Sequence, residues 1–300
     1  MPSVIAAIRA VVDRIGRPRR GGAGGAGPDH ARVSLVRFDQ VPSSREDLDQ
    51  LIRWQVKKSA PFPIEEASLT LDAGSPVDRR RLRVRGGAGQ ARHHPGIREA
   101  CESAGLHAGL VDLSTFSVVN CYSGGGRVPT GDWLLVQMRS DYTSIAIMRG
   151  GDVIFFRNKG EGEGDTLADL VHQSTMHYQD RLSGQGFTRV LVGGTGRPAA
   201  ATSRWPAAAS RTASACPVET IDPTRVATLT DRITVTRDVM ARLAPLVGMM
   251  LRTRQETGDG LMLRTNLSTR PFYNVRAVRA LLDAWPRCSS PGSRCSTRRS

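Results

Sequence analysis

The chain has 300 residues, of which 39% are hydrophobic, and this is enough for two modest domains with a buried core. No apolar run reaches the roughly 18 residues that a membrane span needs, and the N-terminus lacks the apolar centre and cleavage site of a secretory signal. The five cysteines form no Cys-x-x-Cys pair, so the sequence indicates neither a zinc site nor a disulfide framework. We therefore expect a cytoplasmic protein without a metal centre.

The formal net charge of +14 raises the question of nucleic-acid binding. Much of the excess lies in arginine-rich tracts at residues 17–20, 79–85 and 294–299. These tracts lie among Gly, Pro and Ser residues and lack the aromatic side chains that stack on bases. A basic nucleic-acid-binding protein stays an alternative, but we expect no specific nucleic-acid partner.

Residues 33–71 have the pattern of two strands joined by a helix. Residues 33–38 alternate like a strand, and Ser43 with Glu46 forms a capping box that marks a helix start. The face expected for this helix consists of Leu48, Leu51, Ile52, Gln55 and Val56, with Trp54 at its flank. Pro61 ends the helix, because proline disfavours helical geometry in the residue before it. We expect residues 67–71 to return as a strand.

The next patterned segment contains two short helices. Residues 98–104 predict a helix closed by Gly105, and residues 110–111 predict a short strand. Asp112 then leads to a helix that begins at Ser114 or Thr115. The alternation of strands and helices from residue 33 to this point predicts a small α+β subdomain.

The stretch from 132 to 196 carries the clearest order of elements. Three apolar runs predict strands at 133–136, 144–148 and 153–156. Gly150-Gly151 joins the second run to the third. A helical stripe of Leu167, Leu170, Val171, Ser174, Tyr178 and Leu182 follows, and residues 188–192 return to strand character. The strand ends in Gly193, Gly194, Thr195 and Gly196, whose amides could face a sugar or phosphate. This is the order found in nucleotide-binding proteins of the actin type.

Four tracts between these segments have no hydrophobic period. They are residues 21–28, 75–96, 197–215 and 286–300, which are rich in Gly, Ala, Ser and Arg. Interdomain linkers explain one or two such tracts, and translation of GC-rich DNA out of frame explains all four. Both explanations remain open, and we expect residues 75–97 to be irregular.

Several segments resemble the PilM-type type IV pilus assembly proteins. The central Ile52-Arg53-Trp54-Gln55 and the turn at residues 60–66 resemble the inserted subdomain of that family. Residues 101–106 and 111–116 resemble the segment that closes this subdomain, and residues 134–157 and 190–196 resemble the second phosphate region and the adenosine loop. Residues 221–223 and the helix at 238–251 are similar to the C-terminal end. The resemblance implies an α/β, actin-like (ribonuclease H-like) core with an inserted α+β subdomain.

The chain also departs from the family pattern. Nothing before Val33 supplies the first phosphate hairpin, so we expect the core to be incomplete at the N-terminus. Gln137 and Arg139 stand where the family tends to have Asp and Gly, although Asp141, Thr143 and Ser144 lie nearby. The resemblance implies ATP with magnesium at these residues and at residues 193–196. We expect weak or lost ATP binding, at most a slow ATPase, and no catalytic residue.

The tail carries a second resemblance. Residues 261–274 are similar to the start of a PilN-type protein, the membrane-anchored partner that the family binds. The residues that this resemblance assigns to partner binding are Asn266, Leu267, Arg270, Pro271 and Phe272. Either two neighbouring reading frames have been joined, or the tail is a tethered ligand, and a third reading is an amphipathic helix without a partner.

Together these segments predict four regions. Residues 1–32 are a remnant of the first actin-like subdomain with a Gly-rich linker, 33–112 the inserted subdomain, 113–255 the second actin-like half, and 256–300 a disordered PilN-like tail. The resemblance implies an assembly scaffold at the cytoplasmic face of the inner membrane. Its partners would be a PilN-type protein, the pilus motor ATPase and further copies of itself. Other actin-like proteins, namely type II secretion components and sugar kinases, are the first alternative, and a chain without function is the last.

Overall fold

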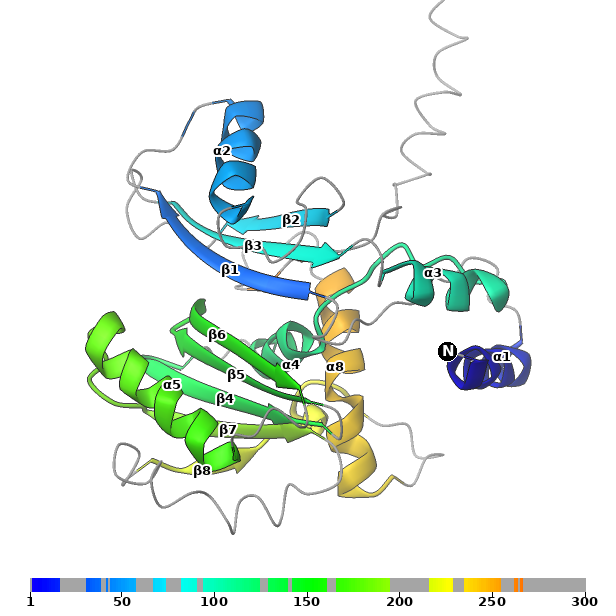
Figure 1. Cartoon of the computed structure of the whole chain (residues 1–300). Coiled ribbons are helices and arrows are strands. Elements are labelled where there is room, and N and C mark those ends of the chain that lie inside the picture. The colour runs from blue at the N-terminus through cyan, green and yellow to red at the C-terminus, as the bar shows by residue number, and fades with distance from the viewer. Residues whose placement is uncertain are drawn as a thin grey trace, which may run out of the picture.

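The structure is a computed structural model that describes most of the chain. The described residues are 2–16, 31–38, 42, 44–57, 67–73, 82–90, 94–124, 129–139, 142–160, 166–194, 216–228, 235–254, 262–263 and 265–266. They form a five-stranded sheet, with strand order β6-β5-β4-β7-β8, and a three-stranded sheet, with order β1-β3-β2. Figure 1 shows the smaller sheet above the larger one.

The larger sheet combines an antiparallel hairpin with parallel strands. β4 (Asp132–Met138), β5 (Tyr142–Arg149) and β6 (Asp152–Gly160) run antiparallel, and β7 (Arg189–Gly194) and β8 (Val218–Thr220) add parallel pairs on the other side of β4. Gly150, at φ +57°, takes the left-handed turn between β5 and β6. The three predicted strands and the strand that precedes the glycines are therefore confirmed.

One face of this sheet is covered by α5 (Leu167–Leu182). Thr166 caps the helix: its hydroxyl accepts a hydrogen bond from the Asp169 amide, and the Asp169 carboxylate accepts one from the Thr166 amide. The predicted stripe is buried at Leu170, Val171, Ser174 and Tyr178. It packs on side chains that alternate along the strands, namely Leu134, Val136, Ile145, Ile147 and Val190.

The opposite face of the sheet carries α4 (Ser114–Ser123) and α8 (Arg237–Arg254), which cross each other (Figure 1). The strand residues of the other parity point to this side, and they include Trp133, Leu135, Ala146, Met148 and Leu191. Phe116 of α4 meets Phe156 of β6 edge to face, with the ring centroids 5.4 Å apart. A short 3-10 turn, η3 (Pro223–Arg225), follows β8 and contacts α8. The central sheet is thus buried on both faces.

The smaller sheet corrects one prediction. β1 (Ala31–Phe38) and β2 (Ala67–Ala73) both pair antiparallel with β3 (Leu82–Gln90), although we expected residues 75–97 to be irregular. The ladder bonds join main-chain groups, so a strand rich in Arg and Gly can pair without an apolar pattern of its own. The expectation that residues 75–97 are irregular is therefore wrong for residues 82–90.

The helix α2 (Arg45–Lys57) covers the face of this sheet that points away from the larger sheet (Figure 1). Ile52 and Val56 are buried as predicted, and Trp54 is 56% exposed at the flank. Gln55 is exposed, so the prediction that it lies on the buried face was wrong. Near the start of the helix, the Ser44 hydroxyl accepts a hydrogen bond from the Asp47 amide. Ser43, which was predicted to form the capping box, lies outside the described residues.

Two further helices lie beside this body. α3 (His94–Ser103) is the predicted short helix with an earlier start, and Gly105, at φ +75°, closes it as expected. α1 (Pro2–Ile15) packs on α3 and was not predicted. The guanidinium of Arg9 donates to the Ser103 carbonyl at 3.1 Å. Residues 21–28, 197–215 and 286–300 lie outside the described part of the chain.

None of the helices formed by the described residues is both long and apolar enough to cross a membrane.

The end of the sheet near the β5–β6 turn is fixed by a partly buried carboxylate. Asp132 forms two hydrogen bonds with the Arg149 guanidinium, at 2.9 and 2.7 Å. The Tyr178 oxygen lies 2.8 Å from Asp132 Oδ2 and 2.9 Å from the Gly186 carbonyl oxygen, so its proton serves one acceptor at a time. Partial burial acts to raise the pKa of Asp132, but the bonds from Arg149 and Tyr178 hold that pKa below its usual value. Burial and Asp132 together raise the pKa of Tyr178 to about 12.

We expect Tyr178→Phe to lower the free energy of unfolding by about 1–2 kcal/mol at pH 7, because a partly buried carboxylate oxygen loses a donor. Urea unfolding followed by circular dichroism measures this. Since the tyrosine pKa is about 12 in the folded state and about 10 in the unfolded state, its contribution is complete below pH 10 and is lost between pH 10 and 12. The variant should lose less stability over that interval, and parallel curves for the two proteins would contradict this assignment.

Candidate functional site

The residues predicted to bind nucleotide meet at one end of the larger sheet. Ser144 of β5 and Gly193 of β7 lie on either side of Gln137 of β4, and Thr143 and Gly194 lie on either side of Met138. The structure therefore brings these four candidates together. Asp141, Thr195 and Gly196 lie outside the described residues.

The glycines at this end serve strand packing. Gly194 has φ +126°, and a Cβ atom placed there would lie 1.6 Å from the Met138 carbonyl oxygen. At Gly193 a Cβ atom would lie 3.3 Å from the Ile221 side chain. Both positions are thus small because neighbouring parts of the protein come close. A ligand is not needed to explain them.

The polar side chains at this end do not match a phosphate and its magnesium. Ser144 is fully buried, and its hydroxyl donates to the Asn158 side-chain oxygen at 3.2 Å. Gln137 stands where the resemblance calls for a carboxylate; it is buried, and its Oε1 has no hydrogen-bond partner among the described residues. A neutral amide oxygen neither carries the charge that attracts magnesium nor donates to phosphate oxygens. Within the described ranges, no three His, Cys, Asp or Glu side chains could hold a metal ion together. The described residues therefore do not fit ATP with magnesium.

A second set of residues lies around the start of α4, where the Ser114 hydroxyl lies 2.6 Å from the Tyr142 oxygen of β5. We call it the tail-docking site and define it as Gly109, Val111, Asp112, Asn120 and Arg252. It contacts Met262, Leu263, Thr265 and Asn266, which we call the docked segment. These contacts join parts of the chain about 150 residues apart in sequence.

Asn120 holds the main chain of Leu263. Its Oδ1 accepts the Leu263 amide at 2.7 Å, and its Nδ2 donates to the Leu263 carbonyl at 2.9 Å. Both residues are fully buried. A side-chain amide has one acceptor and one donor group side by side, so it pairs with an extended residue much as a neighbouring strand would.

Asn266 makes the same kind of pair in the reverse sense. Its Oδ1 accepts the Val111 amide at 3.1 Å, and its Nδ2 donates to the Gly109 carbonyl at 3.2 Å. Here the asparagine belongs to the docked segment, and the main-chain groups belong to the tail-docking site. The two amides fix the segment at both ends.

Asp112 lies between these two pairs and is fully buried. Its carboxylate accepts hydrogen bonds from the Leu113 amide, at 2.8 Å, and from the hydroxyls of Ser117 and Thr265. Arg252 of α8 lies 3.0 Å from its Oδ2 and also donates to the Thr265 carbonyl. Burial raises the pKa of Asp112, and the charge of Arg252 and the hydrogen bonds act against this rise. A buried carboxylate with an arginine and three further donors meets the conditions under which such a group is tolerated.

Arg252 reaches this site because α8 crosses α4 closely. A Cβ atom at Gly248 would lie 1.7 Å from the Ser117 carbonyl oxygen, so only a glycine allows this approach. Gly248 lies one helical turn before Arg252, on the buried side of α8. The contact between the helices therefore sets where the guanidinium lies.

The tail-docking site contains one residue that the sequence analysis had singled out. Asn266 was assigned to partner binding, and it contacts the body of the protein, whereas Leu267, Arg270, Pro271 and Phe272 lie outside the described residues. Asp112, Asn120 and Arg252 were not singled out. One signal was available: Asn120 interrupts the apolar residues of a helix that is buried on nearly every side. A polar side chain in such a place needs a partner.

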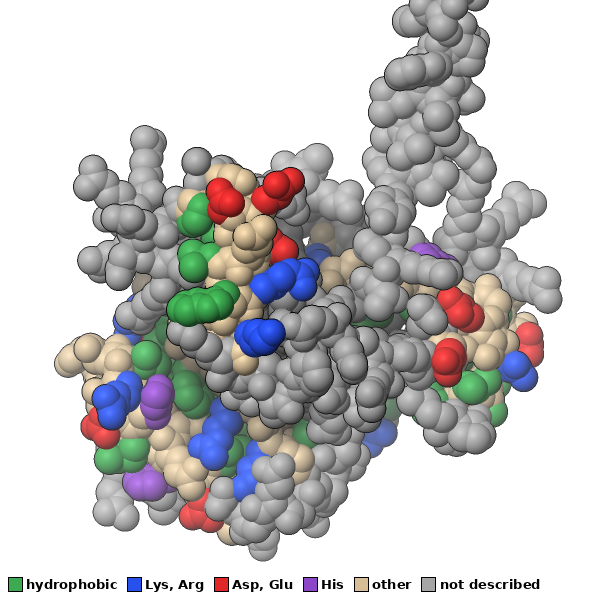
Figure 2. Space-filling view, turned by 45° about the horizontal axis from the view of Figure 1, so that its top comes forward, with side chains coloured by type: hydrophobic (Ala, Val, Ile, Leu, Met, Phe, Trp, Pro, Cys, Tyr) green, Lys and Arg blue, Asp and Glu red, His purple; other side chains and the backbone are tan. Residues whose placement is uncertain are grey.

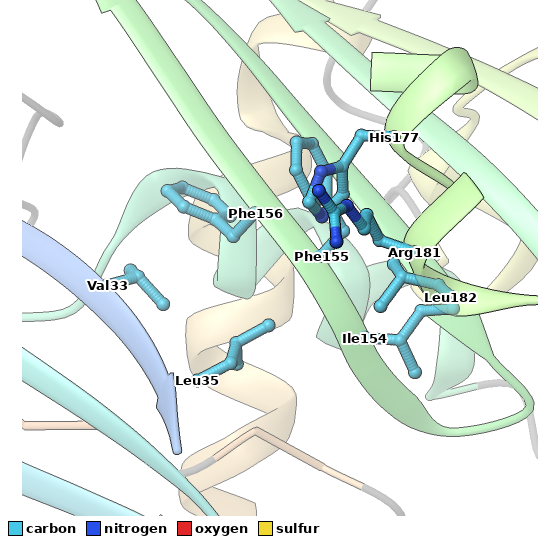
Figure 3. A pocket seen from close by; sticks show the side chains of 8 residues that line it. All are labelled: Val33, Leu35, Ile154, Phe155, Phe156, His177, Arg181 and Leu182. Atoms are coloured by element: carbon cyan, nitrogen blue, oxygen red, sulfur yellow. The ribbon is translucent and has the colours of Figure 1, made fainter. Parts of the chain in front are cut away.

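A pocket of about 460 Å³ lies elsewhere, between the two sheets (Figure 3). Val33 and Leu35 of β1 line one side, and Ile154, Phe155 and Phe156 of β6 with His177, Arg181 and Leu182 of α5 line the rest. The His177 ring packs on Phe155, with the centroids 5.1 Å apart. Apolar side chains line it together with His177 and Arg181, and this combination suggests no particular ligand.

We expect ATP with magnesium to leave the melting temperature unchanged, because the candidate glycines pack against β4 and the Ser144 hydroxyl is already bonded. A site with a micromolar dissociation constant would add about 4 kcal/mol to the free energy of unfolding at millimolar ATP. Differential scanning fluorimetry with and without ATP, with magnesium alone as the control, measures the shift. A rise that requires both ATP and magnesium would show that this expectation is wrong.

We expect Gly248→Ala to destabilise the protein by roughly 1–3 kcal/mol, because the added methyl group forces α8 away from α4. The matched control is Leu246→Ala on the same helix, at a position that is 55% exposed, where we expect a change within about 0.5 kcal/mol. Urea unfolding of both variants measures the difference. Equal stabilities would mean that the close crossing is not required.

Comparison with known proteins gives no sequence relative but a clear likeness of fold. No family model and no curated protein matches the sequence. Among solved structures, the PilM-PilN type IV pilus biogenesis complex matches with a TM-score of 0.68 at 14% identity, covering 83% of this chain and 84% of the other. The cytoplasmic domain of EpsL, from the type II secretion system of Vibrio cholerae, matches at 0.44 with 10% identity over 87% and 84%. A Bacteroides thetaiotaomicron protein with an actin-like ATPase fold matches at 0.42 with 8% identity over 72% and 76%. The chain therefore shares a mixed α/β fold with the solved PilM-PilN complex.

Proposed function

We propose that this chain is an assembly scaffold of a type IV pilus system and binds the N-terminal tail of a PilN-type partner. The observation that carries the proposal is the tail-docking site, in which two asparagine amides and a buried Asp112–Arg252 pair hold the docked segment. The likeness of fold to the PilM-PilN complex supports it. So does the segment itself, because residues 261–274 resemble the start of a PilN-type protein.

The chemistry of the site suits a peptide tail. Asn120 bonds both main-chain groups of Leu263, and the Leu263 side chain is fully buried. Strand-like bonding of this kind provides affinity, and burial of alternate side chains provides selectivity. Thr265 and Asn266 add contacts that depend on the side chain, through Asp112 and through the backbone of residues 109 and 111.

The proposed role is binding and not turnover. The candidate nucleotide residues that the structure describes do not fit ATP with magnesium, so the chain works through its partners. A PilN-type protein would hold it at the cytoplasmic face of the inner membrane, and contact with the pilus motor ATPase or with further copies would link it to twitching motility.

The nucleic-acid alternative finds no support on the visible face. In Figure 2 the Lys and Arg side chains of the described residues are scattered among acidic and uncharged ones. A duplex-binding surface gathers its positive charge along one face, since its affinity depends on neutralising successive phosphates.

The proposal predicts that a synthetic peptide of residues 261–274 binds the full chain. We expect saturable binding by isothermal titration calorimetry. In a chain whose own tail carries Asn266→Ala, we expect the added change Asn120→Ala to weaken binding about tenfold or more, because two hydrogen bonds to the peptide main chain are lost. A peptide with alanine in place of Asn266 should bind correspondingly less. Absence of binding to the wild-type chain and to its tail variants alike contradicts the proposal.

A further inference from the structure

We propose that the tail-docking site is occupied by the chain's own docked segment, so that Met262, Leu263, Thr265 and Asn266 act as an intramolecular ligand in the place that a partner's tail would take. The inference rests on the proposed function, because it assigns the same site to an occupant within the chain. Two groups of observations carry it: the buried polar side chains that the segment completes, and the short connection between the segment and α8.

The docked segment completes buried groups of the body. Asn120 is fully buried, and both polar atoms of its side chain bond Leu263. Asp112, which is also fully buried, accepts the Thr265 hydroxyl. Removing the segment would take a donor and an acceptor from Asn120 and a donor from Asp112. A buried polar group that loses its partner is costly, so the body strongly favours an occupied site.

The segment also presents the features that the site selects. Leu263 and Asn266 stand three residues apart, and each is held by a pair of hydrogen bonds. Met262 extends the contact over α4, where its methyl group lies 3.4 Å from the position of a Cβ atom at Gly124. The site therefore takes an extended peptide with a buried aliphatic residue and an asparagine three places later.

The connection favours occupation from within the chain. α8 ends at Arg254, and residues 255–261 join it to Met262. Arg252, in the last turn of α8, itself bonds the Thr265 carbonyl. A linker of this length gives the tethered segment an effective concentration of about the millimolar range. A free partner tail therefore competes with a ligand that is always present.

The first experiment measures this competition with full-length chains. A fluorescent peptide of residues 261–274 is titrated into the wild type, into Asn266→Ala and Leu263→Ala, which weaken the docked segment, and into Leu246→Ala, an exposed position on α8, as the control. We expect the peptide to bind Asn266→Ala and Leu263→Ala at least about tenfold more tightly than the wild type, because the first loses two side-chain hydrogen bonds of the segment and the second loses a fully buried aliphatic side chain. The control should bind like the wild type.

The second experiment detects release of the segment without any peptide. The Val111 amide donates to the Asn266 side chain, so its hydrogen exchange reports the docked state. We expect exchange at Val111 to become at least fivefold faster in Asn266→Ala, while the amides of β4 keep their wild-type rates, which also shows that the variant is folded.

The outcomes separate the two ideas. Equal peptide affinity in wild type and tail variants, or unchanged exchange at Val111, overturns the intramolecular ligand and leaves the proposed function intact. No peptide binding in any chain overturns the proposed function, and faster exchange at Val111 would then still show a docked tail. Tighter binding in the tail variants with faster exchange supports both.

Discussion

The buried carboxylate of Asp112 is the group on which this arrangement depends. It stands at the junction where residues 109–112 lead into α4, and it is bonded by α4 through Ser117, by α8 through Arg252 and by the docked segment through Thr265. A charge with no exposure must have all of these donors, because the interior supplies no water in their place. One carboxylate therefore joins α4 to α8 and to the docked segment, which lie about 140–150 residues away in sequence.

The close crossing of α4 and α8 is the second requirement of the site. Gly248 lets the helix backbones meet, and this places Arg252 beside Asp112. The same pair of helices covers one face of the five-stranded sheet, so the packing of the core and the geometry of the docking site share their contacts. The opposite face, under α5, takes no part in the site.

The sequence predicted the elements whose patterns are strong and local. The hairpin at 132–160 and the helix at 167–182 follow from short apolar runs, a Gly-Gly turn and a helical stripe. β3 was missed because its pairing uses main-chain groups and its own residues carry no apolar period. The docking site was mostly missed, because Asn120, Asp112 and Arg252 are brought together by folding and no local spacing connects them. The glycines at 193–194 were assigned to nucleotide, since sequence cannot distinguish a close strand from a ligand.

Recognition through the main chain tolerates change in sequence. The hydrogen bonds that Asn120 makes to Leu263 survive substitution by any residue with an N–H group, so proline alone would remove one of them. A peptide and its binding surface can then diverge through evolution while their mutual geometry persists. The sequence identity between such proteins can then become low while the fold remains similar, as in the 14% identity that accompanies the likeness of fold found here.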